Sequence, residues 1–212
     1  MTMLVTATLA ASCSGSSELP APETIGGEWA QFEIDKNINV TTIDDFLGRT
    51  DTVYRDMRML VDPVDFSLIG GDSYLSGFIK GFTVIPYPYL CGPIELPSSL
   101  GEPYAGPTLF TESEGEYTAN FEQSMAIMET CFPRDKNIFV MCGAGGYAMM
   151  TKNLLVGLGW DTARIWNVGC YWSYSGSNNV EVKETDEEGN VYYAFYLVDY
   201  VNIDFAYLTP KP

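Results

Sequence analysis

Residues 138–160 read IFVMCGAGGYAMMTKNLLVGLGW, and this stretch decides the fold class that the sequence predicts. The apolar run at residues 138–141 is typical of a parallel strand that is buried on both faces. It leads directly into Cys142 and a glycine-rich turn. Residues 147–158 then space their apolar side chains as a helix does, and Gly159 is typical of a helix end. A buried strand, a tight turn and a helix in this order indicate an α/β protein.

Segments on either side extend this pattern to a mostly parallel central sheet. We predict strands over residues 52–56, 83–85 and 163–166, a helix over residues 119–130, and a short helix within residues 40–47. Because strands alternate with helices, we expect about four or five strands with helices on both faces of the sheet.

One domain is predicted between a tether and a β extension, since 212 residues suffice for a domain of ordinary size and a tail. The domain covers residues 38–176, with a loop insertion rich in proline and glycine at residues 92–116. Residues 14–37 carry prolines and glycines that predict a flexible tether. Residues 177–212 contain two β-rich runs around a Gly-Asn turn, which predicts a C-terminal β-hairpin.

The first 13 residues, MTMLVTATLAASC, resemble the end of a bacterial lipoprotein signal. They are apolar and too short to span a bilayer as a helix. Small residues precede Cys13, which we expect to carry the lipid, although no basic residue comes before Lys36. The sequence therefore predicts export to the cell envelope, with membrane contact only through a lipid anchor on Cys13 at the outer face of the membrane.

The composition excludes several classes of function. The chain has 28 acidic and 11 basic residues, a formal charge of −17, and such a surface repels nucleic acid and anionic lipid headgroups. It has no histidine, which removes histidine-based triads, Cys-His pairs and histidine metal ligands. Its five cysteines include no C-x-x-C pair, so we expect neither a structural metal site nor a metal cofactor.

Cys142 is the candidate nucleophile. The glycines of the turn allow successive backbone N–H groups to point inward as an anion-binding nest, and the helix that follows adds the positive end of its dipole. Together they are expected to lower the pKa of the thiol and to stabilise a thiolate or a persulfide without histidine. The residues predicted to contact substrate here are Gly143, Ala144, Gly145, Gly146 and Tyr147.

Several motifs, in order over about residues 40–175, resemble the rhodanese family. Cys142 is followed by a glycine at the third position, Gly145, and further downstream come Leu158-Gly159-Trp160, Gly169-Cys170 and Trp172. Upstream, Asp56-Met57-Arg58 matches an Asp-x-Arg at a strand end, and residues 77–82 loosely match the family's Gly-His-Ile-Pro-Gly-Ala. The resemblance implies a rhodanese-like fold and a sulfurtransferase or persulfide carrier. It also implies that Asp56 and Arg58 line the pocket or hold the neighbouring loops together.

The resemblance implies a small sulfane-sulfur donor and a thiol acceptor as partners, with no cofactor. This loop departs from active thiosulfate sulfurtransferases because it has no Arg or Lys, and Tyr147 stands at the common Arg position. Two alternatives therefore remain open: a catalytically weak rhodanese-fold binding module in the envelope, or a redox-sensing role for Cys142. The strand order of the family further suggests that Cys170 lies near Cys142 and could act as its resolving thiol. The competing interpretation is that Cys170 is a small, inert buried residue.

Overall fold

The computed structural model describes residues 18–58, 77–92 and 106–212 of the chain. The predicted leader with Cys13, and residues 93–105 of the predicted insertion, lie outside the described residues.

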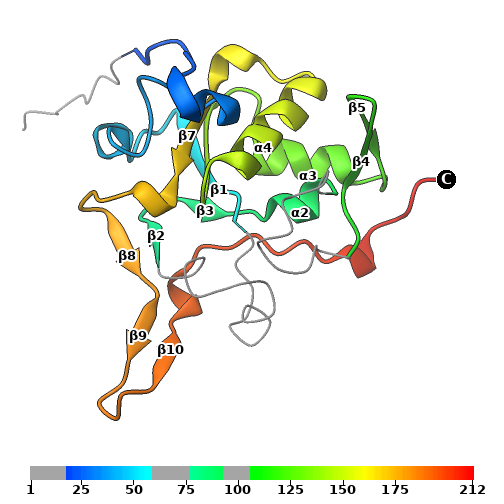
Figure 1. Cartoon of the computed structure of the whole chain (residues 1–212). Coiled ribbons are helices and arrows are strands. Elements are labelled where there is room, and N and C mark those ends of the chain that lie inside the picture. The colour runs from blue at the N-terminus through cyan, green and yellow to red at the C-terminus, as the bar shows by residue number, and fades with distance from the viewer. Residues whose placement is uncertain (1–17, 59–76, 93–105) are drawn as a thin grey trace, which may run out of the picture.

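A parallel sheet of four strands in the order β3–β1–β6–β7 forms the centre of the structure (Figure 1). Its strands are β1 (Thr52–Asp56), β3 (Thr83–Val84), β6 (Asn137–Cys142) and β7 (Ile165–Cys170). All three pairings are parallel, which confirms the predicted α/β class with a mostly parallel sheet. The C-terminal segment returns to the β3 edge, where Val84 forms a parallel bridge with Tyr200.

The two faces of the sheet are covered differently. Alternate residues of β6 enter two separate cores, with Val140 in one and Phe139 in the other. The first core is closed by α2 (Tyr87–Leu90), α3 (Ser124–Cys131) and α4 (Gly146–Gly157). The second core is closed by the 3₁₀ helix η2 (Ile43–Phe46) and by loops. Among the described residues, α-helices cover one face of the sheet and a 3₁₀ helix with loops covers the other, in agreement with the predicted central sheet flanked by helices.

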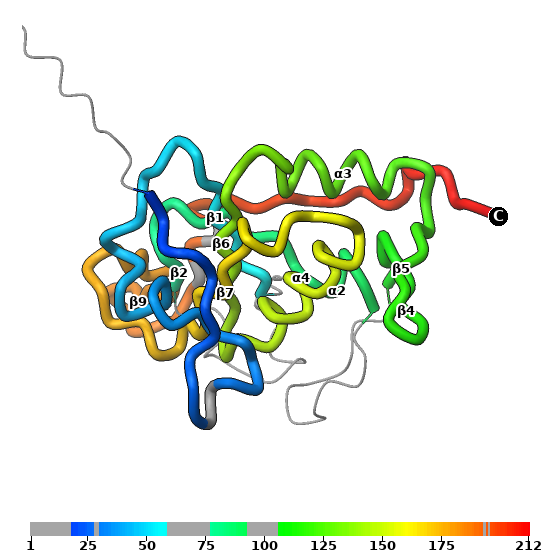
Figure 2. The backbone as a smooth tube through the Cα atoms, turned by 90° about the horizontal axis from the view of Figure 1, so that it is seen from above, coloured from blue at the N-terminus to red at the C-terminus, as the bar shows by residue number. Residues whose placement is uncertain are grey.

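Three two-stranded antiparallel pairs surround the central sheet. They are β2 (Gly77–Ile79) with β8 (Asn179–Glu181), β4 (Phe110–Ser113) with β5 (Glu116–Ala119), and β9 (Lys183–Thr185) with β10 (Val191–Tyr193). The β9–β10 hairpin projects away from the main body (Figure 1) and matches the predicted C-terminal hairpin. Beyond it the chain runs back beside α3 (Figure 2), and the backbone N–H of Glu122 donates to the carbonyl of Thr209 over 2.9 Å.

Two predicted elements begin later than expected. The helix predicted from residue 119 starts at Ser124, because residues 116–119 pair with β4 across a turn in which Gly115 has a φ of 83°. The strand predicted over residues 163–166 is replaced at its start by the 3₁₀ helix η5 (Thr162–Arg164), whose N-cap Asp161 accepts from the N–H of Ala163. The strand β7 then extends to Cys170.

The predicted tether is packed against the domain from residue 19 onward, and we name residues 23–38 the N-terminal cover. The N–H of Asp35 donates to the carbonyl of Asn167 over 2.8 Å, so the cover is hydrogen-bonded along β7. Ile34 and Ile38 are 5% and 0% exposed. The proline and glycine pattern described the irregular backbone correctly, but buried apolar residues give this segment a fixed place.

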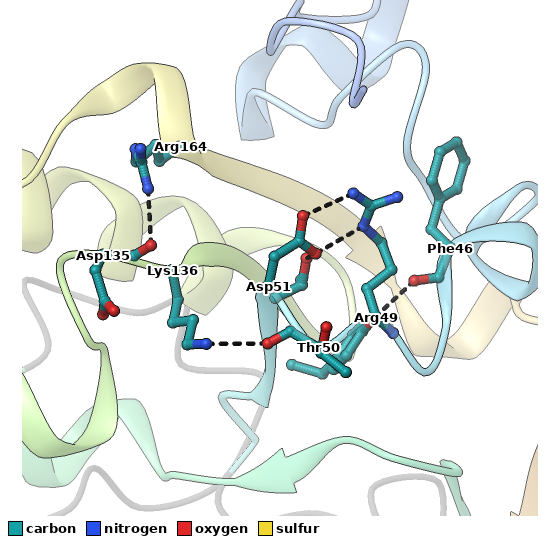
Figure 3. A network of polar contacts seen from close by, with 9 residues as sticks. Phe46, Arg49, Thr50, Asp51, Asp135, Lys136 and Arg164 are labelled. Atoms are coloured by element: carbon teal, nitrogen blue, oxygen red, sulfur yellow. Dashed lines mark hydrogen bonds and ion pairs between the residues drawn. The ribbon is translucent and has the colours of Figure 1, made fainter. Parts of the chain in front are cut away.

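The amino-terminal edge of the sheet carries a network of polar contacts (Figure 3). Arg49 pairs with Asp51 through two hydrogen bonds of 3.0 and 2.8 Å. Lys136, just before β6, donates to the carbonyl of Thr50 over 3.0 Å. Arg164, just before β7, donates to the carbonyl of Asp135 over 2.9 Å. These contacts join the starts of three strands, and Cys142 lies at the opposite edge.

Candidate functional site

Cys142 ends β6, one of the two inner strands, at the carboxyl edge of the parallel sheet. The chain turns immediately into α4, and Gly145 adopts a φ of 101°, a conformation that favours glycine. This turn brings the N–H of Gly145 to 3.1 Å from the sulfur of Cys142, to which it donates. The loop is therefore built as the sequence predicted, with a backbone donor directed at the thiol.

Burial decides the acidity of this thiol. The residue is 3% exposed, and the loss of solvation raises the pKa of Cys142 above its ordinary value. The backbone amides of Ala148, Gly145 and Ala144 act in the opposite direction on this pKa, and the nearby charge of Asp56 adds to the increase. The expected lowering of the thiol pKa is thus wrong for this state of the protein, because the backbone dipoles do not offset complete burial.

The N-terminal cover lies directly over the turn. A Cβ at Gly145 would stand 3.3 Å from Ile34 Cδ1 and from Phe32 Cβ, so the glycine allows the cover to approach the loop closely. Gly169 of β7 is equally close, since a Cβ there would stand 3.0 Å from Ile34 Cγ2. Glu33 of the cover also pairs with Lys152 of α4 over 3.4 Å. Ile34 consequently packs against both backbone segments that flank the thiol.

Asn167 connects the three parts of this arrangement, and sequence reasoning missed it. Its side-chain amide donates to the carbonyl of Phe32 over 2.6 Å and to that of Gly145 over 3.1 Å, while its oxygen accepts from the N–H of Gly169 over 2.9 Å. The side chain is 1% exposed, and each of its polar atoms has a partner. A polar residue within the otherwise apolar strand Ile165–Cys170 was the available signal.

Trp172 covers the other side of the loop. A Cβ on Gly143 would stand 2.6 Å from Cζ2 of its ring, and the backbone N–H of Trp172 donates to the carbonyl of Gly143 over 3.3 Å. The indole is 43% exposed, so this side of the loop is closed by a side chain at the protein surface.

Asp56 and Arg58 form a buried ion pair at the carboxyl end of β1, next to β6. Arg58 Nη2 lies 2.5 Å from Asp56 Oδ2, and both side chains are 0% exposed. Arg58 also donates to the carbonyl of Gly77 over 2.9 Å, and its guanidinium lies 3.9 Å from the centre of the Tyr171 ring. The pair thereby joins β1, β2 and the 3₁₀ helix η6 (Tyr171–Ser173) that follows β7, which supports the interpretation that it holds loops together.

The remaining predicted residues are distributed around the turn. Gly143, Ala144, Gly145 and Gly146 form the turn and the start of α4. Tyr147 stacks on Tyr87, with ring centres 5.4 Å apart, and does not point freely into solvent. Cys170 lies in register with Cys142 on the neighbouring strand.

No family model, curated protein or solved structure matches this chain. No helix among the described residues is long and apolar enough to cross a membrane. Over those same ranges, no group of three or more Cys, Asp or Glu side chains is placed to hold a metal ion. The chemistry of the site must therefore be inferred from its own geometry.

Proposed function

We propose that this protein is a rhodanese-like persulfide carrier in which Cys142 accepts sulfane sulfur. The Cys142 thiolate attacks the outer sulfur of a donor, the S–S bond of the donor breaks, and the donor leaves with the bonding electron pair. The product is a Cys142 persulfide, which an acceptor thiol attacks at the outer sulfur, regenerating the Cys142 thiolate.

The hydrogen bond from Gly145 N–H to Cys142 Sγ is the observation that carries the proposal. Ala144 and Ala148 also stabilise the charged form of the thiol through their backbone amides. A charge on sulfur at this place is stabilised by fixed backbone dipoles and needs no histidine or metal. The position at the carboxyl end of an inner parallel strand is also the usual place for ligand binding in open α/β sheets.

The charges around the site favour a donor with little negative charge. Arg58, which was predicted to line the pocket or to hold the neighbouring loops together, is fully buried and hydrogen-bonded to Asp56. Its charge is thereby balanced within the protein. Thiosulfate carries two negative charges, whereas the turn offers only backbone dipoles. An organic persulfide, which carries at most one negative charge, therefore suits the site better than thiosulfate.

A catalytically weak binding or redox-sensing module is the second candidate, and the burial of the thiol favours it. Cys142 is 3% exposed and its pKa is raised, so both access and the thiolate fraction are low in the described state. A carrier in this state must move the N-terminal cover or Trp172 before a donor reaches the sulfur.

Mass spectrometry of the intact protein after incubation with an organic persulfide tests the proposal. We expect one added sulfur per chain, located on Cys142 by peptide mapping and transferred to an added acceptor thiol. Cys142→Ser should lose the added mass, and Cys131→Ser, which alters another buried cysteine, should retain it. Sulfur on other cysteines only, or none after the cover is loosened by Ile34→Ala, would refute the carrier role and favour the second candidate.

A further inference from the structure

Cys142 and Cys170 lie directly beside each other on neighbouring strands. They are Cα partners in the parallel pairing of β6 with β7. Adjacent strands lie about 4.8 Å apart, within the range of Cα separations that a disulfide bridges. The strand order of the resembling family suggested this proximity, and the register of the two strands determines it.

An irregularity in β7 produces this register. The pairing shifts between Val140 and Met141, so that Val168 has no opposite residue and Met141 pairs with Gly169. Gly169 has a φ of 96°, which favours glycine over other residues. Without the extra residue, Cys142 would lie opposite Gly169 and not Cys170. The bulge therefore places the two cysteines side by side, and bulges often have this effect next to functional sites.

The backbone is fixed on both sides of the pair. Before the cysteines, Met141 pairs with Gly169, and after them the N–H of Trp172 donates to the carbonyl of Gly143 over 3.3 Å. A bond between the two sulfurs therefore needs side-chain rotation and little movement of the main chain. The strands are held at the separation that the disulfide requires before the bond forms.

Cys170 differs from Cys142 in its surroundings. Cys142 belongs to the first core, whereas Cys170 belongs to neither of the two hydrophobic cores, although it is only 6% exposed. Its thiol donates a long hydrogen bond, 3.7 Å between sulfur and oxygen, to the hydroxyl of Ser173. Both thiols are free in the structure. A cysteine that only filled space would be expected to pack into one of the cores.

We propose that Cys142 and Cys170 are a redox-active pair in which Cys170 resolves oxidised Cys142 as an intrachain disulfide. The Cys142 thiolate attacks the outer oxygen of a hydroperoxide, the O–O bond breaks, and the alkoxide or hydroxide leaves and takes a proton. The resulting sulfenic acid is attacked by the Cys170 thiol, which forms the S–S bond and releases water. Two electrons pass from the thiols to the peroxide, and a small dithiol reverses the reaction.

This inference goes beyond sulfur carriage and does not depend on it. During oxidation the disulfide would block the Cys142 thiol as a nucleophile. It would also protect Cys142 from irreversible conversion to sulfinic acid. The inference gives Cys170 a chemical role, because the Cys170 sulfur forms a bond to the reacting sulfur of Cys142.

Mild hydroperoxide treatment of the full chain, followed by non-reducing peptide mapping, tests the pair. We expect a Cys142–Cys170 crosslink within one chain, the loss of two titratable thiols and full reversal by a dithiol. In Cys170→Ser we expect Cys142 to proceed to sulfinic acid. Cys131→Ser, a matched change at another buried cysteine, should crosslink as the wild type does.

Two results would overturn the inference. One is wild-type Cys142 that reaches sulfinic acid without a crosslink to Cys170, and the other is wild-type Cys142 that resists oxidation altogether. The wild-type mapping decides the question even if a variant fails to fold. Persulfide loading of Cys170→Ser reports on the proposed carrier function alone, so failure of one proposal is distinguishable from failure of the other.

Discussion

The guanidinium of Arg58 and the carboxylate of Asp56 form an ion pair in which neither side chain is exposed to solvent. The pair stands at the carboxyl end of β1, and the charge of Asp56 acts on the pKa of Cys142. The ion pair therefore connects neighbouring segments of the chain and also contributes to the electrostatic environment of the thiol.

Arg58→Met is expected to destabilise the protein by about 3 to 5 kcal/mol, because it leaves the Asp56 carboxylate buried without its partner. The double variant Asp56→Asn with Arg58→Met should recover part of that loss, since no uncompensated charge remains. Denaturant unfolding measures the free energy of unfolding of both variants. An Arg58→Met protein as stable as the wild type would show that the pair is open to water.

Ile34→Ala should expose Cys142, because Ile34 packs against Gly145 and Gly169 on either side of the thiol. Ile43→Ala is the matched control, since Ile43 is also buried but belongs to the second core. Each change should cost about 2 to 5 kcal/mol of stability. Only Ile34→Ala should accelerate alkylation of Cys142, and peptide mapping measures the rate of that alkylation. Equal acceleration in both would indicate general loosening instead.

Tyr147→Arg is expected to increase turnover of thiosulfate about tenfold, because a hydrogen bond to a charged group contributes about 1.5 kcal/mol or more. Tyr147 occupies the start of α4, beside the turn. Val156→Arg adds the same charge near the other end of α4 and should leave turnover unchanged. Cyanide-dependent release of sulfite and thiocyanate measures the reaction. Fast turnover by the wild type would mean that another cation reaches the donor.

The free energy of unfolding should fall as the pH rises above about 8.5, the ordinary pKa of a cysteine. Burial raises the pKa of Cys91, Cys131 and Cys142 in the folded state. Above the unfolded pKa, the unfolded chain releases protons that the folded chain still holds. Stability then falls by up to about 1.4 kcal/mol per pH unit for each such thiol.

Denaturant unfolding between pH 7 and about pH 9.5 in the presence of a reductant measures this slope. Cys142→Ser should show a shallower decline than the wild type, since it removes one of the groups. A wild-type stability that stayed level over this interval would contradict the burial of these thiols.

The sequence by itself determined the α/β class and the position of the central strands. The strand predicted over residues 52–56 is β1, and the apolar run before Cys142 lies in β6. The run before Cys142 is recognisable because a strand buried on two faces needs a continuous apolar run, and β1 is recognisable because its residues alternate between buried and half-buried positions. Both patterns are local properties of the sequence. The turn after Cys142 was predictable for a similar reason, since Gly145 satisfies a local backbone requirement.

The sequence misplaced the elements whose limits depend on distant partners. Residues 110–113 were predicted to belong to a loop insertion, but pairing with residues 116–119 makes them a strand. The N-terminal cover looks like a tether by composition, yet Ile34 and Asp35 are buried against parts of the chain that lie more than a hundred residues away.

Only the tertiary structure decided the state of the thiol and its neighbour. The pKa of Cys142 depends on how much water reaches the sulfur, and Ile34, Trp172 and the first core determine that together. The proximity of Cys170 depends on one unpaired residue in β7, which shifts the register by a single position. Local pattern specifies which segments form strands, whereas burial and register arise from contacts between segments that the chain brings together only on folding.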